Sequence, residues 1–114
     1  MMAVAVITVM TYNTRVTIRV DWDERKSRVL RQKRGFTLDH VAKVFESITV
    51  ELVKNDDPLQ FAAIGLVENN LLTVIFEERR DEEGPYLWLI TYWKSTARER
   101  EIYEQEASRL DRRD

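Results

Sequence analysis

Alternating polar and apolar residues mark the first clear element of the chain, the segment Arg15–Trp22. Its even-numbered positions are apolar and its odd-numbered positions carry Arg, Thr or Asp, and this period of two predicts a half-buried strand. Asp21, with Glu24 three positions later, has the spacing of a capping box and predicts the start of a helix. We expect this helix to end at Arg34, because Gly35 suits a left-handed stop.

Two amphipathic helices are predicted in succession. The helix ending at Arg34 has a narrow apolar stripe, Trp22, Val29 and Leu30, which should face the core. Thr37 is a good N-cap residue for a second, shorter helix. The apolar residues of that second helix recur at spacings of three and four: Leu38, Val41, Ala42, Val44 and Phe45.

Strands dominate the second half of the chain. Four strand-like segments follow one another: Ile48–Val53, Phe61–Val67, Leu71–Phe76 and Tyr86–Trp93. The pair Asn69–Asn70 tolerates positive φ and therefore suits a tight hairpin between the second and third of them. The charged segment Arg79–Pro85 predicts an exposed loop. Thr96 and Glu99 form another capping box, which opens a helix that continues to about Leu110.

These elements predict an α+β domain, with an antiparallel β-sheet of four to five strands, two N-terminal helices and one C-terminal helix. The strands pair antiparallel because their connections are short. The length of 114 residues fits one domain over residues 1–114, in which residues 1–14 form an extra N-terminal strand or a flexible extension. The chain has no Cys, and no apolar run approaches the ~18 residues of a membrane span. We therefore expect a cytoplasmic protein without a disulfide, a thiolate zinc site or a membrane segment.

Charge is strongly segregated along the chain. The segment Arg25–Arg34 contains six basic residues among ten and no acidic one. The whole chain has 18 Lys+Arg and 20 Asp+Glu, so the remainder carries 12 against 20, a balance of −8. Such a cationic surface on an anionic molecule suits a polyanion or an acidic partner. A solvated helix face explains the same pattern equally well.

Several segments resemble the BrnT toxin family. The run Trp22–Lys26 is similar to the family's W-D-E-x-K, and Lys33–Gly35 corresponds to its K-H-G. Ala42–Phe45 corresponds to an Ala-containing helix that ends in V-F. Three further segments match in the same order: Ile64–Gly65, Glu78–Arg79 and Ile90–Tyr103. The resemblance spans about Val20–Glu104.

This resemblance implies a RelE-like fold and a toxin of a type II toxin–antitoxin pair. Such a toxin would be a metal-independent ribonuclease without a cofactor, and a cognate DNA-binding antitoxin of ribbon-helix-helix type would neutralise it. The chain departs from the family pattern where the family has Asn, His or Arg: Leu30, Arg34, Gln60, Trp88 and Trp93. The alternative is therefore a catalytically inactive BrnT-fold protein that acts through protein–protein binding or self-association, for instance as a homodimer.

Metal-free RNA cleavage needs proton transfer at the 2′- and 5′-oxygens and neutralisation of the phosphorane charge. The catalytic candidates are Lys33, Arg98, Glu99 and Tyr103. The RNA-binding candidates are basic: Arg25, Lys26, Arg28, Arg31, Arg34, Arg79, Lys94 and Arg100. If the end of the first helix approaches the start of the last, four cations would form a phosphate-sized notch: Lys33, Arg34, Lys94 and Arg98.

Several of these candidates could have a structural role instead of a catalytic or RNA-binding one. Glu99 is explained by its capping box, and Tyr103 by a place at the edge of the core. His40 has no paired acid in an evident motif, so we do not expect it to act as a base. Aromatic residues of the last strand could stack bases, and alternation places Trp88 and Tyr92 on one face and Trp93 on the other.

Overall fold

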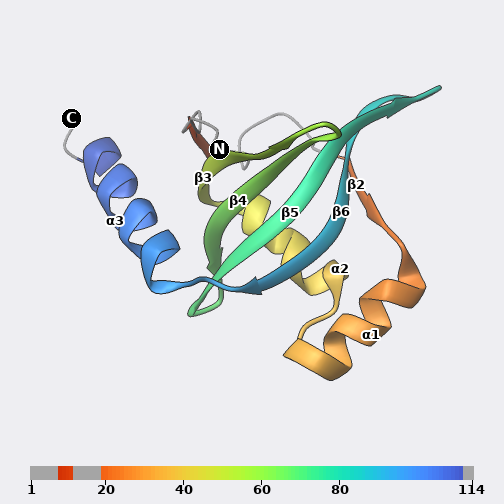
Figure 1. Ribbon diagram of the computed structural model, residues 1–114, viewed down its shortest axis with the longest axis horizontal. Helices are drawn as coiled ribbons and strands as arrows, with labels where there is room; N and C mark the ends of the chain where they lie inside the picture. The colour runs from red at the N-terminus through yellow and green to blue at the C-terminus, as the bar shows by residue number, and fades with distance from the viewer. Residues whose placement is uncertain (1–7, 12–18, 112–114) are drawn as a thin grey trace.

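The computed structural model describes residues 8–11 and 19–111 and consists of a six-stranded sheet with helices packed against it (Figure 1). The elements in chain order are β1 Thr8–Thr11, β2 Val20–Trp22, α1 Glu24–Arg34, α2 Leu38–Val41, the 3₁₀ helix η1 Ala42–Glu46, β3 Ile48–Asp56, β4 Leu59–Val67, β5 Asn70–Asp81, β6 Gly84–Lys94 and α3 Ala97–Asp111. The strand order across the sheet is β1-β3-β4-β5-β6-β2. None of the described helices is both long enough and apolar enough to cross a membrane.

The α+β class is confirmed, but the sheet differs from the prediction. It has six strands instead of four to five, and it is mixed because β2 runs parallel to β6. A parallel pair needs a long connection, so no turn between adjacent segments could reveal it. The two helices that were predicted as N-terminal follow the strands β1 and β2 and therefore lie farther along the chain. Of residues 1–14, Thr8–Thr11 forms a strand that pairs antiparallel with β3, and the others lie outside the described residues.

Helix α1 begins two residues later than the capping pattern predicts. Asp23 is the N-cap residue, and its Oδ1 accepts a hydrogen bond from Lys26 N at 3.1 Å. Asp21 is instead part of β2, so its assignment as the cap was wrong. The predicted C-terminal stop is confirmed, since Gly35 has a φ of 102° and its N–H donates to the Arg31 carbonyl. A residue with a Cβ rarely adopts this φ, which explains the glycine.

One face of α1 contacts the domain, and it is narrower than predicted. Leu30 is 5% exposed and belongs to the core, whereas Val29 is 43% exposed, so the prediction that both are buried was wrong for Val29. Consecutive residues on a helix are about 100° apart, so the narrow contact face of α1 includes Leu30 and leaves Val29 outside it. The buried face instead contains Ser27, whose Oγ accepts a hydrogen bond from Leu38 N at 2.8 Å.

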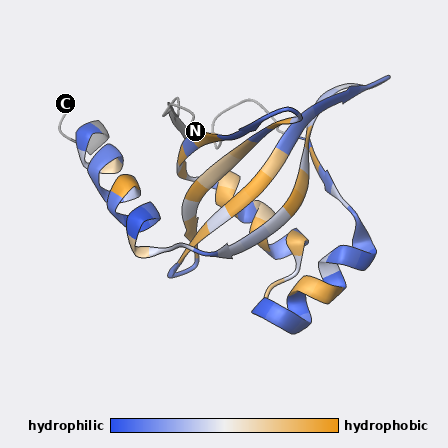
Figure 2. Ribbon diagram, viewed as in Figure 1, coloured by the Kyte–Doolittle hydropathy of each residue, from blue (hydrophilic) through white to orange (hydrophobic). Residues whose placement is uncertain are grey.

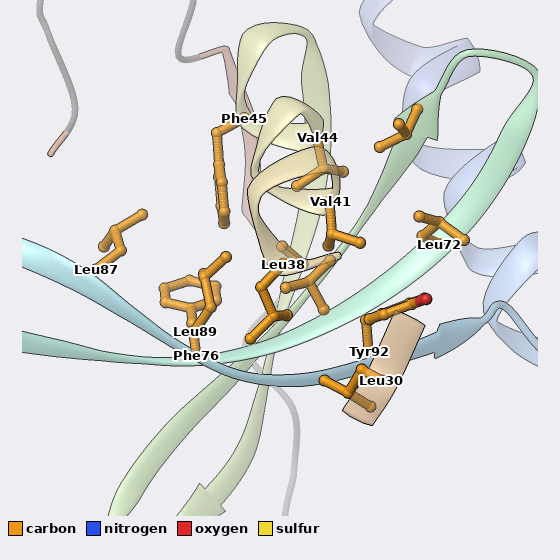
Figure 3. Close-up of a cluster of buried hydrophobic side chains, with 13 residues drawn as sticks. Leu30, Leu38, Val41, Val44, Phe45, Leu72, Phe76, Leu87, Leu89 and Tyr92 are labelled. Carbon is orange, nitrogen blue, oxygen red and sulfur yellow. The ribbon is translucent and has the colours of Figure 1, made fainter. Parts of the chain in front are cut away.

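The main core lies between the sheet and the helices α1, α2 and η1 (Figure 3). The apolar residues predicted for the second helix occupy it, and all except the half-buried Ala42 are fully buried. The sheet residues that meet them come from three strands: Ala63 and Val67 of β4, Leu72, Val74 and Phe76 of β5, and Leu87, Leu89 and Tyr92 of β6. Figure 2 shows the hydrophobic residues concentrated along these strands, while α1 is mostly hydrophilic.

The hairpin formed by β5 and β6 is longer than predicted. Arg79–Pro85, predicted as a loop, contains the ends of β5 and β6, joined at Glu82–Glu83. Cross-strand and side-chain contacts hold this charged segment: Arg79 lies 4.7 Å from the Trp88 ring centroid and pairs with Glu77. The turn between β4 and β5 also differs from the prediction, because the positive φ of 58° falls on Glu68 and not on Asn69 or Asn70.

A register shift in β6 changes the faces of its aromatic residues. The pairing moves by one residue between Ile75 and Phe76 of β5, so β6 bulges after Leu89. Trp88 and Trp93 pair with the odd-numbered Glu77 and Thr73 and therefore share one face. Tyr92 points to the opposite face, into the core. The prediction that Trp88 and Tyr92 share a face was wrong because regular alternation ignores the bulge.

Acidification should weaken the hairpin formed by β5 and β6. The Gln60 amide, which donates to Glu77 at 2.9 Å, and the Arg79 guanidinium lower the pKa of Glu77. A carboxyl group whose pKa is lower in the folded state than in the unfolded state stabilises the fold at pH values above its unfolded-state pKa. This stabilisation is lost as the pH falls through the folded-state pKa. Glu77→Gln should therefore lower the melting temperature near pH 7 and have little effect near pH 3, with a loss below about 1 kcal/mol.

The control for this prediction is Glu78→Gln, which removes the same charge from an exposed neighbour on β5. Thermal unfolding of both variants and the wild type across this pH range measures the difference. Equal effects of the two variants at both pH values would contradict the role assigned to Glu77.

Candidate nucleic-acid interface

The outward faces of α1 carry the predicted basic residues. Because Ser27 and Leu30 anchor the helix, the six cations remain exposed, and we call them the α1 cationic surface: Arg25, Lys26, Arg28, Arg31, Lys33 and Arg34. None of the six forms a salt bridge with a carboxylate of the described residues. Their positive charge is therefore available to an external anion.

Five of the described cations outside α1 are paired with carboxylates: Arg19, Arg79, Arg98, Arg100 and Arg109. On α3, Arg98 lies 3.5 Å from Glu101 and Arg100 lies 4.0 Å from Glu104. Arg79 makes two hydrogen bonds to Glu77, at 2.9 and 2.8 Å. These neighbours cancel much of the local positive charge, so the predicted RNA-binding residues fall into two classes. Those on α1 are unpaired among the described residues, as is Lys94 at the end of β6, whereas Arg79 on β5 and Arg100 on α3 have carboxylate partners.

A hollow of about 340 Å³ lies where the end of α1 meets the end of β6. It is lined by Arg34, Phe36, Asn70, Leu72, Tyr92, Trp93 and Lys94. The Arg34 guanidinium is held at its edge, because Nη1 donates to the Tyr92 carbonyl and to Thr91 Oγ1. The structure therefore brings together Arg34 and Lys94 of the predicted notch, whereas Lys33 and Arg98 do not line the hollow.

The four predicted catalytic residues are distributed over two helices. Lys33 is on α1, and the other three are on α3: Arg98, Glu99 and Tyr103. Figure 1 shows α1 and α3 on opposite sides of the molecule. Tyr103 is half-buried on its helix. The structure thus does not gather these residues into one cluster, and a catalytic role for any of them stays a prediction.

Glu99 is occupied by contacts within the fold. The predicted capping box is present, since Thr96 N donates to Glu99 Oε1 at 2.9 Å and Glu99 N donates to Thr96 Oγ1 at 3.1 Å. The same Oε1 accepts from Thr73 Oγ1 at 2.9 Å and from Trp93 Nε1 at 3.0 Å. Thr73 is completely buried, so this carboxylate ties α3 to the sheet.

Tyr92 fastens the segment between α1 and α2 to the sheet. Its hydroxyl donates to the Phe36 carbonyl at 2.9 Å and accepts from Phe36 N at 2.8 Å. Burial raises the pKa of the Tyr92 hydroxyl, so it remains a neutral donor. Tyr92 is 1% exposed and therefore holds the wall of the hollow instead of stacking on a ligand.

His40 has an acidic partner that the sequence did not reveal. Its Nε2 lies 3.0 Å from Glu68 Oε2, and its ring stacks on Phe36 with centroids 4.7 Å apart. Glu68 is in the turn between β4 and β5, 28 positions along the chain, so no local motif links the two. No motif in the sequence pairs His40 with an acid, and the fold supplies one; His40 lies beside the hollow, because Phe36 both stacks on its ring and lines the hollow.

The described residues contain no group of three or more His, Asp or Glu side chains placed to hold a metal ion. Neither a scan of protein-family models nor a search of curated proteins finds a match for this chain. The resemblance to BrnT toxins therefore stays a prediction, and the geometry of the α1 cationic surface and the hollow is the basis for assigning a function.

Proposed function

We propose that this protein binds single-stranded RNA through the α1 cationic surface. The observation that carries the proposal is the set of six exposed cations without a described carboxylate partner. Phosphate groups provide the negative charge that such a surface attracts. The balance of −8 over the rest of the chain would orient an approaching polyanion toward α1.

We further propose that RNA binding serves a toxin of BrnT type with a RelE-like fold, as the sequence resemblance implies. In this role the protein would cleave RNA without a metal, and a cognate ribbon-helix-helix antitoxin would neutralise it. The antitoxin would cover the cationic surface with acidic residues, since the same charge serves both ligands. Co-purification with the product of a neighbouring gene tests this part.

A second candidate is a binding protein of the same type without nuclease activity. Two observations favour it: Glu99 Oε1 already accepts three hydrogen bonds, and α1 and α3 lie on opposite sides of the molecule. A general base must be able to reach the proton that it removes. The hydrogen bonds that Glu99 Oε1 accepts within the fold suit a structural role better than proton transfer.

RNA binding should depend on salt and on α1. Each phosphate contact of a single strand contributes about −0.7 to the slope of log affinity against log salt concentration. The triple variant Arg25→Ala/Lys26→Ala/Arg28→Ala should therefore weaken binding about tenfold or more and reduce the magnitude of the slope by about 2. Fluorescence anisotropy with a labelled single-stranded RNA between about 50 and 200 mM salt measures both quantities.

The matched control removes three cations that are paired within α3, in the variant Arg98→Ala/Arg100→Ala/Arg109→Ala. It loses the same formal charge and should change affinity by less than about threefold, because neighbouring acids already offset these cations. Equal losses in the two triple variants would mean that net charge alone governs binding, which contradicts a site on α1.

Cleavage of RNA and arrest of growth on expression test the toxin assignment separately. A wild-type protein that is inert in both assays but binds RNA would overturn the ribonuclease and leave the second candidate. If it cleaves RNA, Arg98→Ala and His40→Ala decide between the residues predicted on α3 and the His40–Glu68 pair.

A further inference from the structure

The hollow between α1 and β6 has the composition of an anion site. Arg34 and Lys94 approach it from different elements, and Asn70 adds an amide from the start of β5. No described residue of its lining carries a carboxylate. The nearby acid Glu68 is turned to His40 at 3.0 Å. Two cations that share a hollow repel each other, and an anion between them would relieve this repulsion.

Arg34 is prepared for this role by its bonds to the sheet. Strand β2 pairs with β6 only as far as Leu89, so the Tyr92 carbonyl beyond it is available to Arg34 Nη1. The contacts of Nη1 fix the guanidinium plane, and Nε and Nη2 have no partner among the described residues. A guanidinium held in this way presents a fork of donors at little entropic cost, as bidentate phosphate binding requires.

The remaining lining suits the organic part of a nucleotide. Phe36 and Leu72 contribute aromatic and aliphatic surface to this lining; Phe36 is half-buried, with its ring stacked on His40, and Leu72 is buried. The volume of about 340 Å³ is at the lower end of the ~300–1,000 Å³ typical of ligand pockets. A single nucleotide is therefore a suitable occupant, whereas a larger ligand would extend out of the hollow.

We infer that this hollow binds one nucleotide of the RNA, with its phosphate between Arg34 and Lys94 and its base or sugar against Phe36. The inference rests on the proposed function and names the subsite at the end of the α1 cationic surface. The C-terminal end of a helix carries partial negative charge, so α1 itself does not attract the phosphate. Affinity at this subsite depends on the two side chains, and loss of either should be plainly measurable.

Adenosine 5′-monophosphate, inorganic phosphate and adenosine are the probes, and amide chemical shifts of the labelled protein report binding. The nucleotide should shift residues of the hollow and bind more tightly than phosphate or adenosine, since only it engages both parts. Lys94→Gln should weaken it at least about tenfold, the effect of one charge-assisted hydrogen bond. Lys54→Gln, an exposed lysine on β3, removes the same charge and should change nothing.

The outcomes separate this inference from the proposed function. Nucleotide shifts confined to α1, or unchanged affinity in Lys94→Gln, would overturn the subsite. If RNA binds through α1 but the nucleotide does not bind, the subsite is wrong and the proposed function stands. If the nucleotide binds and RNA does not, the subsite stands and RNA binding is wrong. A glutamate-rich peptide that occupies the hollow more tightly than the nucleotide would assign it to an acidic protein partner and overturn the inference.

Discussion

Replacing Leu30 by alanine is expected to lower the free energy of unfolding by about 2–4 kcal/mol. Leu30 is 5% exposed and is the only apolar residue of α1 within the core cluster. Helices of this length, 11 residues, are marginal in isolation, so tertiary contacts must hold α1 in place. The hydrogen bond between Ser27 and Leu38 cannot replace the lost apolar contact.

Val29→Ala is the matched control, because it removes side-chain carbons from the adjacent position on the same helix. Val29 is 43% exposed, and its loss should be within about 0.5 kcal/mol. Chemical denaturation followed by circular dichroism measures both variants. Similar losses at the two positions would show that α1 packs through a wider face than Ser27 and Leu30.

The local features of the fold could be predicted from the sequence. The caps at Thr37 and Thr96 and the stop at Gly35 depend on residues a few positions apart, and all three are present. The apolar spacing after Thr37 likewise predicts the buried face of α2 and η1. Such features are readable because the interacting groups are close in the chain.

The features that were missed depend on contacts between distant segments. The partner of β2 is β6, and the two strands run parallel. The helices α1, α2 and η1 and the strands β3, β4 and β5 separate them along the chain. The bulge in β6 moves Tyr92 to the core face, where regular alternation does not place it. Val29 and Leu30 are both apolar, and only the direction from which the sheet approaches α1 decides which one is buried.

The candidate site shows the same division. The cationic character of α1 was evident from composition, and its exposure follows from the narrow buried face. The pairing of His40 with Glu68 was not evident from the sequence, because Glu68 lies 28 positions farther along the chain, in the turn between β4 and β5. Two of the four cations of the predicted notch line the hollow, Arg34 and Lys94. They are close because the hydrogen bond from Arg34 to the Tyr92 carbonyl joins the end of α1 to β6.

Gly65→Ala should destabilise the domain by about 2–3 kcal/mol through overpacking. A Cβ at this position would lie 2.6 Å from Val44 Cγ2, and also 3.2 Å from Thr49 Cγ2. Both neighbours are completely buried, so neither can move into solvent. The lower entropy of an unfolded chain with Ala instead of Gly offsets only about 0.4–1 kcal/mol of this loss.

A double-mutant cycle with Val44→Ala identifies the clash as the cause. Val44→Ala alone removes buried methyl groups and should cost about 1.5–3 kcal/mol. In Gly65→Ala/Val44→Ala the new methyl group occupies space that the Val44 methyl has left, so the double variant should be more stable than additivity predicts by about 1–2 kcal/mol. The free energies of unfolding of the four proteins, measured under one set of conditions, give this coupling. Strictly additive losses would contradict the contact between η1 and β4 that the structure places at Gly65, and with it the position of the helical layer over the sheet.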